Sequence, residues 1–268
     1  MKSHSLIVLA LIVLFFSCKK ETATYQSKTG NNSTTGIMLR NNETRTYKGP
    51  EVMIGNGKGR SLIVLDEKGN PLSLTIELNN EALTGLPDEE TEYVLPLHRK
   101  AREATPFDHI TVNWNPHGHE PEHVYDLPHF DFHFYKVSLH EQKSIPPYGP
   151  ATAALFDNFP PMGYLPATYV PIPGGVPQMG KHWVDVTSPE LNGQPFTKTF
   201  IYGTYNGQVT FFEPMATLAL LQSNAASEAN ISQPQLFAPT GNFYPGAYRI
   251  DADGGNHYIS LNNFTWQP

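Results

Sequence analysis

The stretch that decides the fold runs His129-Phe130-Asp131-Phe132-His133-Phe134-Tyr135, in which phenylalanines alternate with side chains that carry polar groups. In an extended strand, residues i, i+2 and i+4 share one face. The three phenylalanines therefore point into a hydrophobic core, and the opposite face presents His129, Asp131, His133 and Tyr135. A helix would scatter the same residues around its axis, and aromatic side chains favour strands.

The rest of the chain supports a mainly β fold. Hairpin patterns lie at 60–78, at 200–212 around Asn206-Gly207, and at 247–261. Further strands are predicted at 93–95 and 109–114. A helix is predicted at 215–221, and residues 80–86 and 151–156 are further candidates for helices. We therefore expect an antiparallel β-sandwich or barrel with one or two short helices.

Nine prolines between Pro146 and Pro177 accompany several aromatic residues. A long loop of this kind inside a compact domain often covers a functional region. We expect this Pro-rich loop to be ordered and to pack over the sheet, shaping a pocket for a small molecule. Its aromatic side chains also allow the chain to self-associate as a homo-oligomer.

The N-terminus has the pattern of a secreted protein. A short basic start and an apolar run from Leu6 to Phe16 predict a signal peptide over residues 1–17. The run is too short to cross a bilayer, which takes roughly 17–25 apolar residues. The one cysteine, Cys18, follows directly, where bacterial lipoproteins are cleaved and acylated. We expect a lipid anchor on Cys18 in the membrane of the bacterial cell envelope, a flexible tether over 18–35, and a single β-rich domain over 36–268.

Composition excludes several classes of protein. A single cysteine cannot build a disulfide framework or a thiolate metal cluster. The net charge of −7, from 18 basic and 25 acidic residues, disfavours nucleic acid as a partner. The sequence contains no Gly-x-Ser-x-Gly elbow, no phosphate-binding loop and no dinucleotide fingerprint. The chemistry of this chain therefore has to come from other residues.

Histidine is the unusual residue type, because eight of the eleven lie between His98 and His140. A polar strand face of imidazoles and a carboxylate needs partners if it is buried, and a divalent metal ion is an economical one. Candidate ligands outside the strand are found in Gly118-His119, Gly180-Lys181-His182 and Phe212-Glu213-Pro214. The expected metal ligands are His119, His129, His133, His182 and Glu213, and the expected metal is Zn, Fe or Mn.

The remaining polar residues have other expected roles. Asp131 and Tyr135 are expected to orient ligands rather than to bind metal directly. Glu213 is also a candidate catalytic acid or base, and an anionic group at a helix N-terminus is the alternative. His117 and His123 are expected in a surface loop. A hydrogen-bonded polar core without metal remains the alternative for the whole set. Four further histidines are expected to be structural or exposed, and they are His98, His109, His140 and His257.

Several of these motifs carry a family resemblance. The strings over 118–135, 179–185, 200–205 and 212–215 resemble an uncharacterised bacterial family, a domain of unknown function named after a hypothetical protein of a thermophilic bacterium. The resemblance covers roughly residues 100–220 and implies a shared fold and histidine site, with members often secreted or lipid-anchored. A weaker analogy links the order of histidine motifs to the cupins, although the cupin glutamate has no counterpart on a strand here.

The sequence thus predicts a cell-envelope lipoprotein of unknown activity with a His/Glu metal site. One hypothesis is a metal-dependent enzyme that acts on a small molecule. The alternative is a non-enzymatic envelope lipoprotein that binds a metal or another ligand, or that has a structural role.

Overall fold

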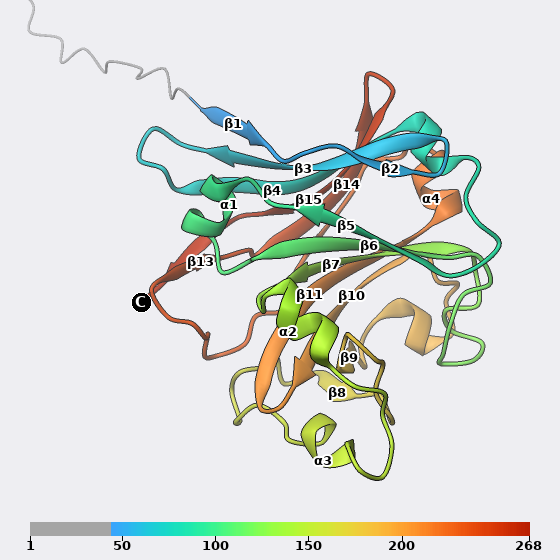
Figure 1. The fold of residues 1–268 in the computed structure, drawn as a ribbon, viewed down its shortest axis with the longest axis vertical. Coiled ribbons are helices and arrows are strands. Elements are labelled where there is room, and N and C mark those ends of the chain that lie inside the picture. Colours follow the sequence, from blue (N-terminus) through green and yellow to red (C-terminus); the bar gives the residue numbers. More distant parts are fainter. Residues whose placement is uncertain (1–43) are drawn as a thin grey trace, which may run out of the picture. The chain divides into compact units, whose positions relative to one another are not determined.

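The computed structural model describes residues 44–268, which belong to one compact unit (Figure 1). The predicted signal peptide, Cys18 and the tether over 18–35 lie outside the described residues. None of the described helices is long and apolar enough to span a membrane.

The first sheet has seven antiparallel strands drawn from the two ends of the described chain (Figure 1). Its main path runs β1-β3-β4-β15-β14-β12, and β2 pairs with β3 beside that path. The strands are β1 (Arg45–Lys48), β2 (Val52–Ile54), β3 (Gly57–Leu65), β4 (Pro71–Asn79), β12 (Ser227–Asn230), β14 (Ala247–Asp253) and β15 (Asn256–Asn262).

The second sheet also has seven antiparallel strands, in the order β5-β6-β7-β11-β10-β9-β8. Its strands are β5 (Thr91–Pro96), β6 (His109–Asn115), β7 (His129–Tyr135), β8 (Tyr169–Pro171), β9 (Lys181–Asp185), β10 (Lys198–Tyr205) and β11 (Gln208–Thr217). The strand that decides the fold, β7, lies inside this sheet between β6 and β11. A short third sheet pairs β13 (Asn242–Tyr244) with β16 (Thr265–Gln267).

The three predicted hairpins are present as β3–β4, β10–β11 and β14–β15. In the β10–β11 turn, Asn206 and Gly207 both have positive φ, of 48° and 79°. A two-residue turn with this backbone matches the twist of the flanking strands, which is why Asn-Gly is found there.

The main core lies between the two large sheets. Phe130, Phe132 and Phe134 of β7 are fully buried in one hydrophobic cluster with residues such as Ile63 and Leu74 of the first sheet. The two sheets are open and do not close into a barrel. Of the two expected architectures, the fold is therefore the β-sandwich. The polar side of β7 therefore faces away from the first sheet.

Helices are few and short in the described part of the chain. They are α1 (Arg99–Ala104), α2 (Leu139–Ser144), α3 (Ala153–Phe156) and α4 (Leu218–Gln222), with 3-10 turns η1 (Asn80–Leu83) and η2 (Pro189–Asn192). Four α-helices are more than the one or two expected, because α1 and α2 carry no long apolar period that would reveal them. The candidates at 80–86 and 151–156 correspond to η1 and α3.

The predicted helix at 215–221 is wrong in its first half. Strand β11 continues through Met215 to Thr217, and α4 begins only at Leu218. Thr217 caps α4 by accepting a hydrogen bond from the backbone N–H of Leu220. Pairing of Met215 and Thr217 with β7 favours the strand over the local helical pattern.

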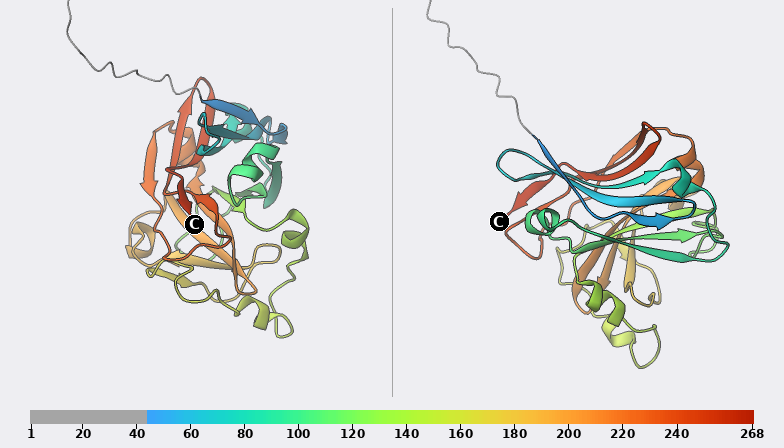
Figure 2. Two further views of the ribbon diagram at one scale, coloured as in Figure 1. Left: turned by 90° about the vertical axis from the view of Figure 1, so that its left-hand side faces the viewer. Right: turned by 45° about the horizontal axis from the view of Figure 1, so that its top comes forward.

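The Pro-rich segment runs from α2 to β9 and contains α3 and β8. In Figures 1 and 2 this segment lies beyond the second sheet, on the side away from the first sheet. It therefore covers the polar face of β7, as the sequence predicted.

Candidate metal centres

The polar face of β7 carries His129, Asp131 and His133, all less than 5% exposed. On β6, Asn115 pairs with His129 and Asn113 pairs with Asp131, so polar residues continue across the sheet. A second hydrophobic cluster covers part of this face, with Tyr125, Phe196 and Met215 among its buried members. Polar groups are therefore held in a largely apolar environment, where each needs a partner.

His119, His129 and Asp131 form the first triad. Their candidate ligand atoms all lie within 4.8 Å of one another. The Nε2 atoms of His119 and His129 lie 3.3 and 3.1 Å from the two oxygens of Asp131. Metal bonds of about 2.0–2.1 Å at tetrahedral angles separate ligand atoms by about 3.3 Å. The spacing of the first triad therefore fits a common metal ion.

Backbone carbonyls fix the tautomers of both imidazoles in the first triad. Nδ1 of His129 lies 2.6 Å from the carbonyl oxygen of Leu127, and Nδ1 of His119 lies 2.7 Å from that of Glu120. A carbonyl only accepts hydrogen bonds, so each Nδ1 carries a proton and donates it. When the rings are neutral, each Nε2 atom therefore carries a lone pair, and both lone pairs point toward the carboxylate of Asp131. This is the orientation that metal-binding histidines adopt.

The loop that carries His119 depends on Gly118. Its φ is +71°, and a Cβ there would lie 2.1 Å from the carbonyl oxygen of Tyr125. The backbone N–H of His119 donates to that same carbonyl at 3.2 Å. Gly118 thus lets the loop fold back against Tyr125 and bring His119 over β7, because only glycine has no Cβ to obstruct this approach.

His133, His182 and Glu213 form the second triad, from three different strands. The pairing of Phe212 with Phe134 and of Met215 with Asp131 sets Glu213 opposite His133. Nε2 of His133 lies 3.5 Å from one oxygen of Glu213, and Nε2 of His182 lies 3.7 Å from the other. All three ligand atoms fall within 4.8 Å of one another.

Thr111 fixes the ring of His133. The hydroxyl of Thr111 donates its proton to Oδ1 of Asn113 at 2.8 Å. The hydroxyl oxygen of Thr111 is therefore free to accept a hydrogen bond from Nδ1 of His133, at 3.4 Å. Nε2 of His133 is then a lone pair that faces Glu213. The second triad thus repeats the arrangement of the first, with a side-chain hydroxyl in place of a backbone carbonyl.

Unsatisfied polar atoms concentrate at these triads. Among residues 44–268, five buried side-chain atoms lack a hydrogen-bond partner, and three of them are Oδ1 of Asp131, Nε2 of His133 and Oε2 of Glu213. Oδ1 of Asp131 is close to His129 but not in hydrogen-bonding geometry with it. Buried polar groups are almost always paired, so a cluster of unpaired ones calls for an explanation. A cation bound in each triad would satisfy all three.

The first triad holds charge in the absence of metal. Burial opposes the charged form of His119, but the hydrogen bond and the negative charge of Asp131 outweigh it and raise the pKa of His119 to about 9. Burial also opposes ionisation of Asp131, yet the neighbouring imidazoles of His129 and His119 hold its pKa well below the usual range. An anionic carboxylate therefore faces a protonated imidazole at neutral pH.

The second triad is neutral in the absence of metal. Burial lowers the pKa of His133 to about 4 and that of His182 to about 3. Burial, together with the negative charge of Asp131, raises the pKa of Glu213 well above its usual value. To bind a cation, the second triad would have to release the proton of Glu213, whereas the first triad would have to release the proton of His119.

A cavity of about 550 Å³ opens onto both triads. His119 and Asp131 of the first triad and His182 of the second line it. The Pro-rich loop forms much of the opposite wall, through residues such as Tyr148 and Pro173. This arrangement agrees with the expectation that the loop shapes a pocket.

The structure brings all five predicted ligands to one face but distributes them over two triads rather than one site. Asp131 lies between the imidazoles of the first triad, at ligand spacing, and not merely behind a ligand as expected. Tyr135 stacks on the ring of His133, with ring centres 5.6 Å apart. Glu213 lies inside β11, which excludes the helix N-terminus alternative.

The other histidines lie outside the triads. His117 and His123 are exposed, with side chains 75% and 89% accessible. The remaining four are distributed as follows: His98 caps α1, His109 is buried against Gln142, His140 is exposed, and His257 is buried.

Sequence reasoning missed two residues that orient the triads. Thr111 holds His133, and the side-chain amide of Asn115 donates to Oδ2 of Asp131 at 2.7 Å. The signal was available, because Thr111, Asn113 and Asn115 alternate with Ile110, Val112 and Trp114 along β6. That alternation predicts a polar face next to the face of β7.

Comparison with known proteins gives one finding. No curated protein and no solved structure matches this chain. Residues 66–114 match the TTHB210-like family, described as hypothetical protein TTHB210. The match spans β4 to β6 and shares only residues 100–114 with the region that the resemblance was expected to cover, and all of the motifs that carry the resemblance lie outside it. Over residues 66–114 the chain is thus similar to an uncharacterised family named after a hypothetical protein of a thermophile, as its sequence motifs predicted.

Proposed function

We propose that this protein binds two divalent metal ions, one in each triad. The observation that carries the proposal is the convergence of imidazole Nε2 atoms and carboxylate oxygens, at 3.1–3.7 Å, with unpaired buried atoms in both triads. Two imidazoles and one carboxylate suit Zn, Fe or Mn. The alternative of a fully hydrogen-bonded polar core is disfavoured because Oδ1 of Asp131, Nε2 of His133 and Oε2 of Glu213 are buried without a hydrogen-bond partner.

We further propose that the metals serve a reaction on a small molecule in the 550 Å³ cavity. Three protein ligands leave a coordination position open, whereas structural sites are normally closed by four. A bound metal would supply Lewis acidity or a water of lowered pKa. Among the protein groups, Glu213 could exchange a proton at its carboxylate, and Asn115 and Thr111 would hold Asp131 and His133 in place.

Metal content tests the first proposal. The full chain, purified with each metal supplied in turn, should hold close to two equivalents by elemental analysis. His129→Ala should remove one equivalent, His133→Ala should remove the other, and the double variant should remove both. The exposed His123→Ala is the matched control and should keep both equivalents. A metal-free wild-type protein under all supplies would contradict the proposal.

The open position can be tested separately from the activity. Cobalt substituted at an open site changes its visible spectrum when azide is added, because azide takes the free position. We expect such a change in the wild-type protein. A cobalt spectrum that azide leaves unaltered would favour the non-enzymatic alternative, in which the metal is carried or is structural.

We also propose that the protein is a cell-envelope lipoprotein, on the support of the N-terminal pattern alone. The lipid on Cys18 would make membrane lipid its partner. Labelling of cells with a palmitate analogue should mark the wild-type chain and not Cys18→Ser. A labelled variant, or an unlabelled wild type that is expressed, would contradict this proposal.

A further inference from the structure

A second cavity, of about 440 Å³, lies on the opposite face of the second sheet from the triads. Its wall includes Tyr202 of β10 and Phe212 of β11. Along β10 and β11 these residues alternate with Ile201, which lines the metal-site cavity, and with Glu213 of the second triad. The second cavity is therefore independent of the proposed metal centres.

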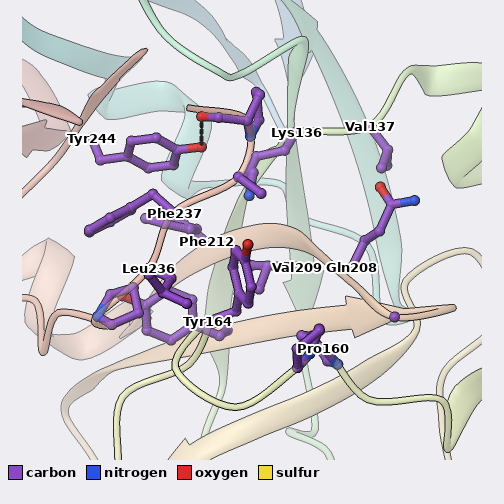
Figure 3. A pocket seen from close by; sticks show the side chains of 16 residues that line it. Lys136, Val137, Pro160, Tyr164, Gln208, Val209, Phe212, Leu236, Phe237 and Tyr244 are labelled. Atoms are coloured by element: carbon purple, nitrogen blue, oxygen red, sulfur yellow. Dashed lines mark hydrogen bonds between the residues drawn. The ribbon is translucent and has the colours of Figure 1, made fainter. Parts of the chain in front are cut away.

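Its walls are mainly aromatic and aliphatic. Figure 3 shows the rings of Tyr164, Phe212, Phe237 and Tyr244 around the same space, with Leu236 beside them. Prolines from the loops at 160–161 and 234–239 complete the wall. A concave, largely apolar pocket of this size is the usual form of a small-molecule site.

Lys136 is the one charged residue in this wall. Among the described residues, no carboxylate lies within ion-pair distance of its Nζ. The Nζ atom makes a cation–π contact with Tyr244, at 5.5 Å from the centre of the ring. Burial lowers the pKa of Lys136 to about 7. Lys136 is partly buried, and a lysine in such a position rarely lacks a partner, because desolvating an ammonium group is costly.

Four other polar side chains line the pocket, those of Tyr164, Tyr202, Gln208 and Tyr244, all of them uncharged, and two of their hydroxyls are occupied. The hydroxyl of Tyr202 donates to the carbonyl of Ser232 at 2.8 Å, and that of Tyr244 donates to the carbonyl of Pro239 at 2.9 Å (Figure 3). Lys136 therefore supplies the available cationic donor of the pocket. The complementary molecule has an apolar body and one anionic acceptor group.

We infer that this pocket binds an apolar monocarboxylate, with its carboxylate paired to Nζ of Lys136 and its body against the aromatic wall. A charge-assisted hydrogen bond is stronger than one between neutral groups, and the ligand would provide the partner that the lysine lacks in the described chain. The aromatic rings offer stacking or edge contacts to the body of the ligand.

Calorimetric titration of the full chain with 2-naphthoate and with decanoate tests this inference. We expect at least one of the two to bind, and the corresponding neutral alcohol to bind at least tenfold more weakly. Lys136→Met keeps the length and apolar stem of the side chain and should weaken carboxylate binding at least tenfold. Lys198→Met removes a lysine that also lies over a tyrosine ring but outside the pocket wall, and should leave binding unchanged.

A second variant protects the test against misfolding. Leu236 is 49% exposed, so Leu236→Trp can fill the pocket from its rim without disturbing the core, and should abolish binding. Absence of binding by both carboxylates to the wild type would overturn the inference. So would equal affinity for acid and alcohol, or wild-type affinity in Lys136→Met.

Discussion

At the scale of single residues, the triads are defined by what holds the far side of each imidazole. His119 and His129 donate Nδ1–H to backbone carbonyls, and His133 donates to Thr111. Each ring is thereby fixed with Nε2 toward a carboxylate before any metal arrives. Such preorganisation reduces the ordering cost of binding, which is why the partners of ligands matter as much as the ligands.

The first prediction concerns Asp131→Asn in metal-free protein. The pKa of His119 is about 9 in the folded protein and 6.5 in the unfolded chain. The contribution of the His119–Asp131 pair to stability is therefore fully present below pH 6.5. That contribution is lost as the pH rises through about 9. The variant should lack this decline, and its His119 should titrate at or below about 6.5, where an unperturbed imidazole does.

Urea midpoints between pH 5 and pH 10 with a chelator, and imidazole NMR, measure these two effects. His117→Ala, at an exposed histidine, should behave as the wild type does. A decline of the same size in Asp131→Asn would show that the pair does not produce it.

The second prediction concerns Glu213→Gln. In metal-free protein the unfolded chain ionises Glu213 above about pH 4.5, whereas burial keeps the folded carboxyl neutral. Wild-type stability should therefore fall as the pH rises above 4.5, by about 1.4 kcal/mol for each unit by which the pKa is raised. Glutamine cannot ionise, so the variant should become more stable than the wild type over this range and should lose the metal of the second triad.

Denaturation series with a chelator, together with metal analysis, check the prediction for Glu213. Glu228→Gln, at an exposed carboxylate, is the control. Parallel stability curves for wild type and Glu213→Gln would mean that Glu213 is already ionised in the folded protein.

At the scale of elements, β7 separates stability from chemistry by alternation. Its odd-numbered residues face the triads, and Phe130, Phe132 and Phe134 face the first sheet. The neighbours extend both layers, since β6 and β11 pair with β7 in register. Substitutions one residue apart should therefore have opposite consequences.

The third prediction compares Phe132→Ala with its neighbour Asp131→Asn. Phe132 is fully buried, so the variant should lose about 3–5 kcal/mol of stability through lost burial and a cavity. If it still folds, both metal sites should bind. Asp131→Asn should lose the first metal, and near pH 10, where the His119–Asp131 pair no longer contributes, it should lose little of that stability. Chemical denaturation and elemental analysis of both variants test this, and a Phe132→Ala protein that folds but has lost its metal would argue against the separation.

The fourth prediction concerns Gly203→Ala on β10. A Cβ there would lie 2.0 Å from the ring of Phe211, which packs against both His133 and His182. Moving that ring should cost about 1–3 kcal/mol and weaken metal binding at the second triad. The first triad does not contact Phe211 in the described structure and should bind as before, which gives an internal control in a metal titration. Unchanged affinity at both triads would contradict the role assigned to Phe211.

At the scale of the whole molecule, the second sheet separates two cavities. One lies under the Pro-rich segment and opens onto the triads, and the other is the Lys136 pocket. Ligands at either site bind the folded chain and stabilise it by mass action. Because the cavities occupy opposite faces, their stabilising effects should add.

The fifth prediction concerns metal removal. Metal at 100 times its dissociation constant should stabilise the fold by about 2.7 kcal/mol per site, or roughly 5–10 °C in Tm for a domain of this size. Chelator should reverse the shift in the wild type. The His129→Ala/His133→Ala variant should show no shift, and calorimetric scans with metal and with chelator measure both. An equal shift in the variant would locate the metal elsewhere.

Local pattern was sufficient for much of the fold. Alternation along β7 predicted both of its faces, and Asn206-Gly207 predicted the β10–β11 hairpin. The short strands at the sheet edges, such as β2 and β8, were not predicted because three residues carry no readable period. The start of α4 was placed too early, because strand pairing with β7 outweighed the helical spacing of Met215 and Leu218.

The sequence by itself determined which side chains lie on the polar face of β7. A strand has a period of two, so His129, Asp131 and His133 had to share a face opposite the phenylalanines. Only the tertiary structure decided how they were divided. The register of β11 against β7 places Glu213 beside His133, and the turn at Gly118 places His119 beside Asp131. Those contacts join residues distant in the chain, and no local period encodes such a pairing.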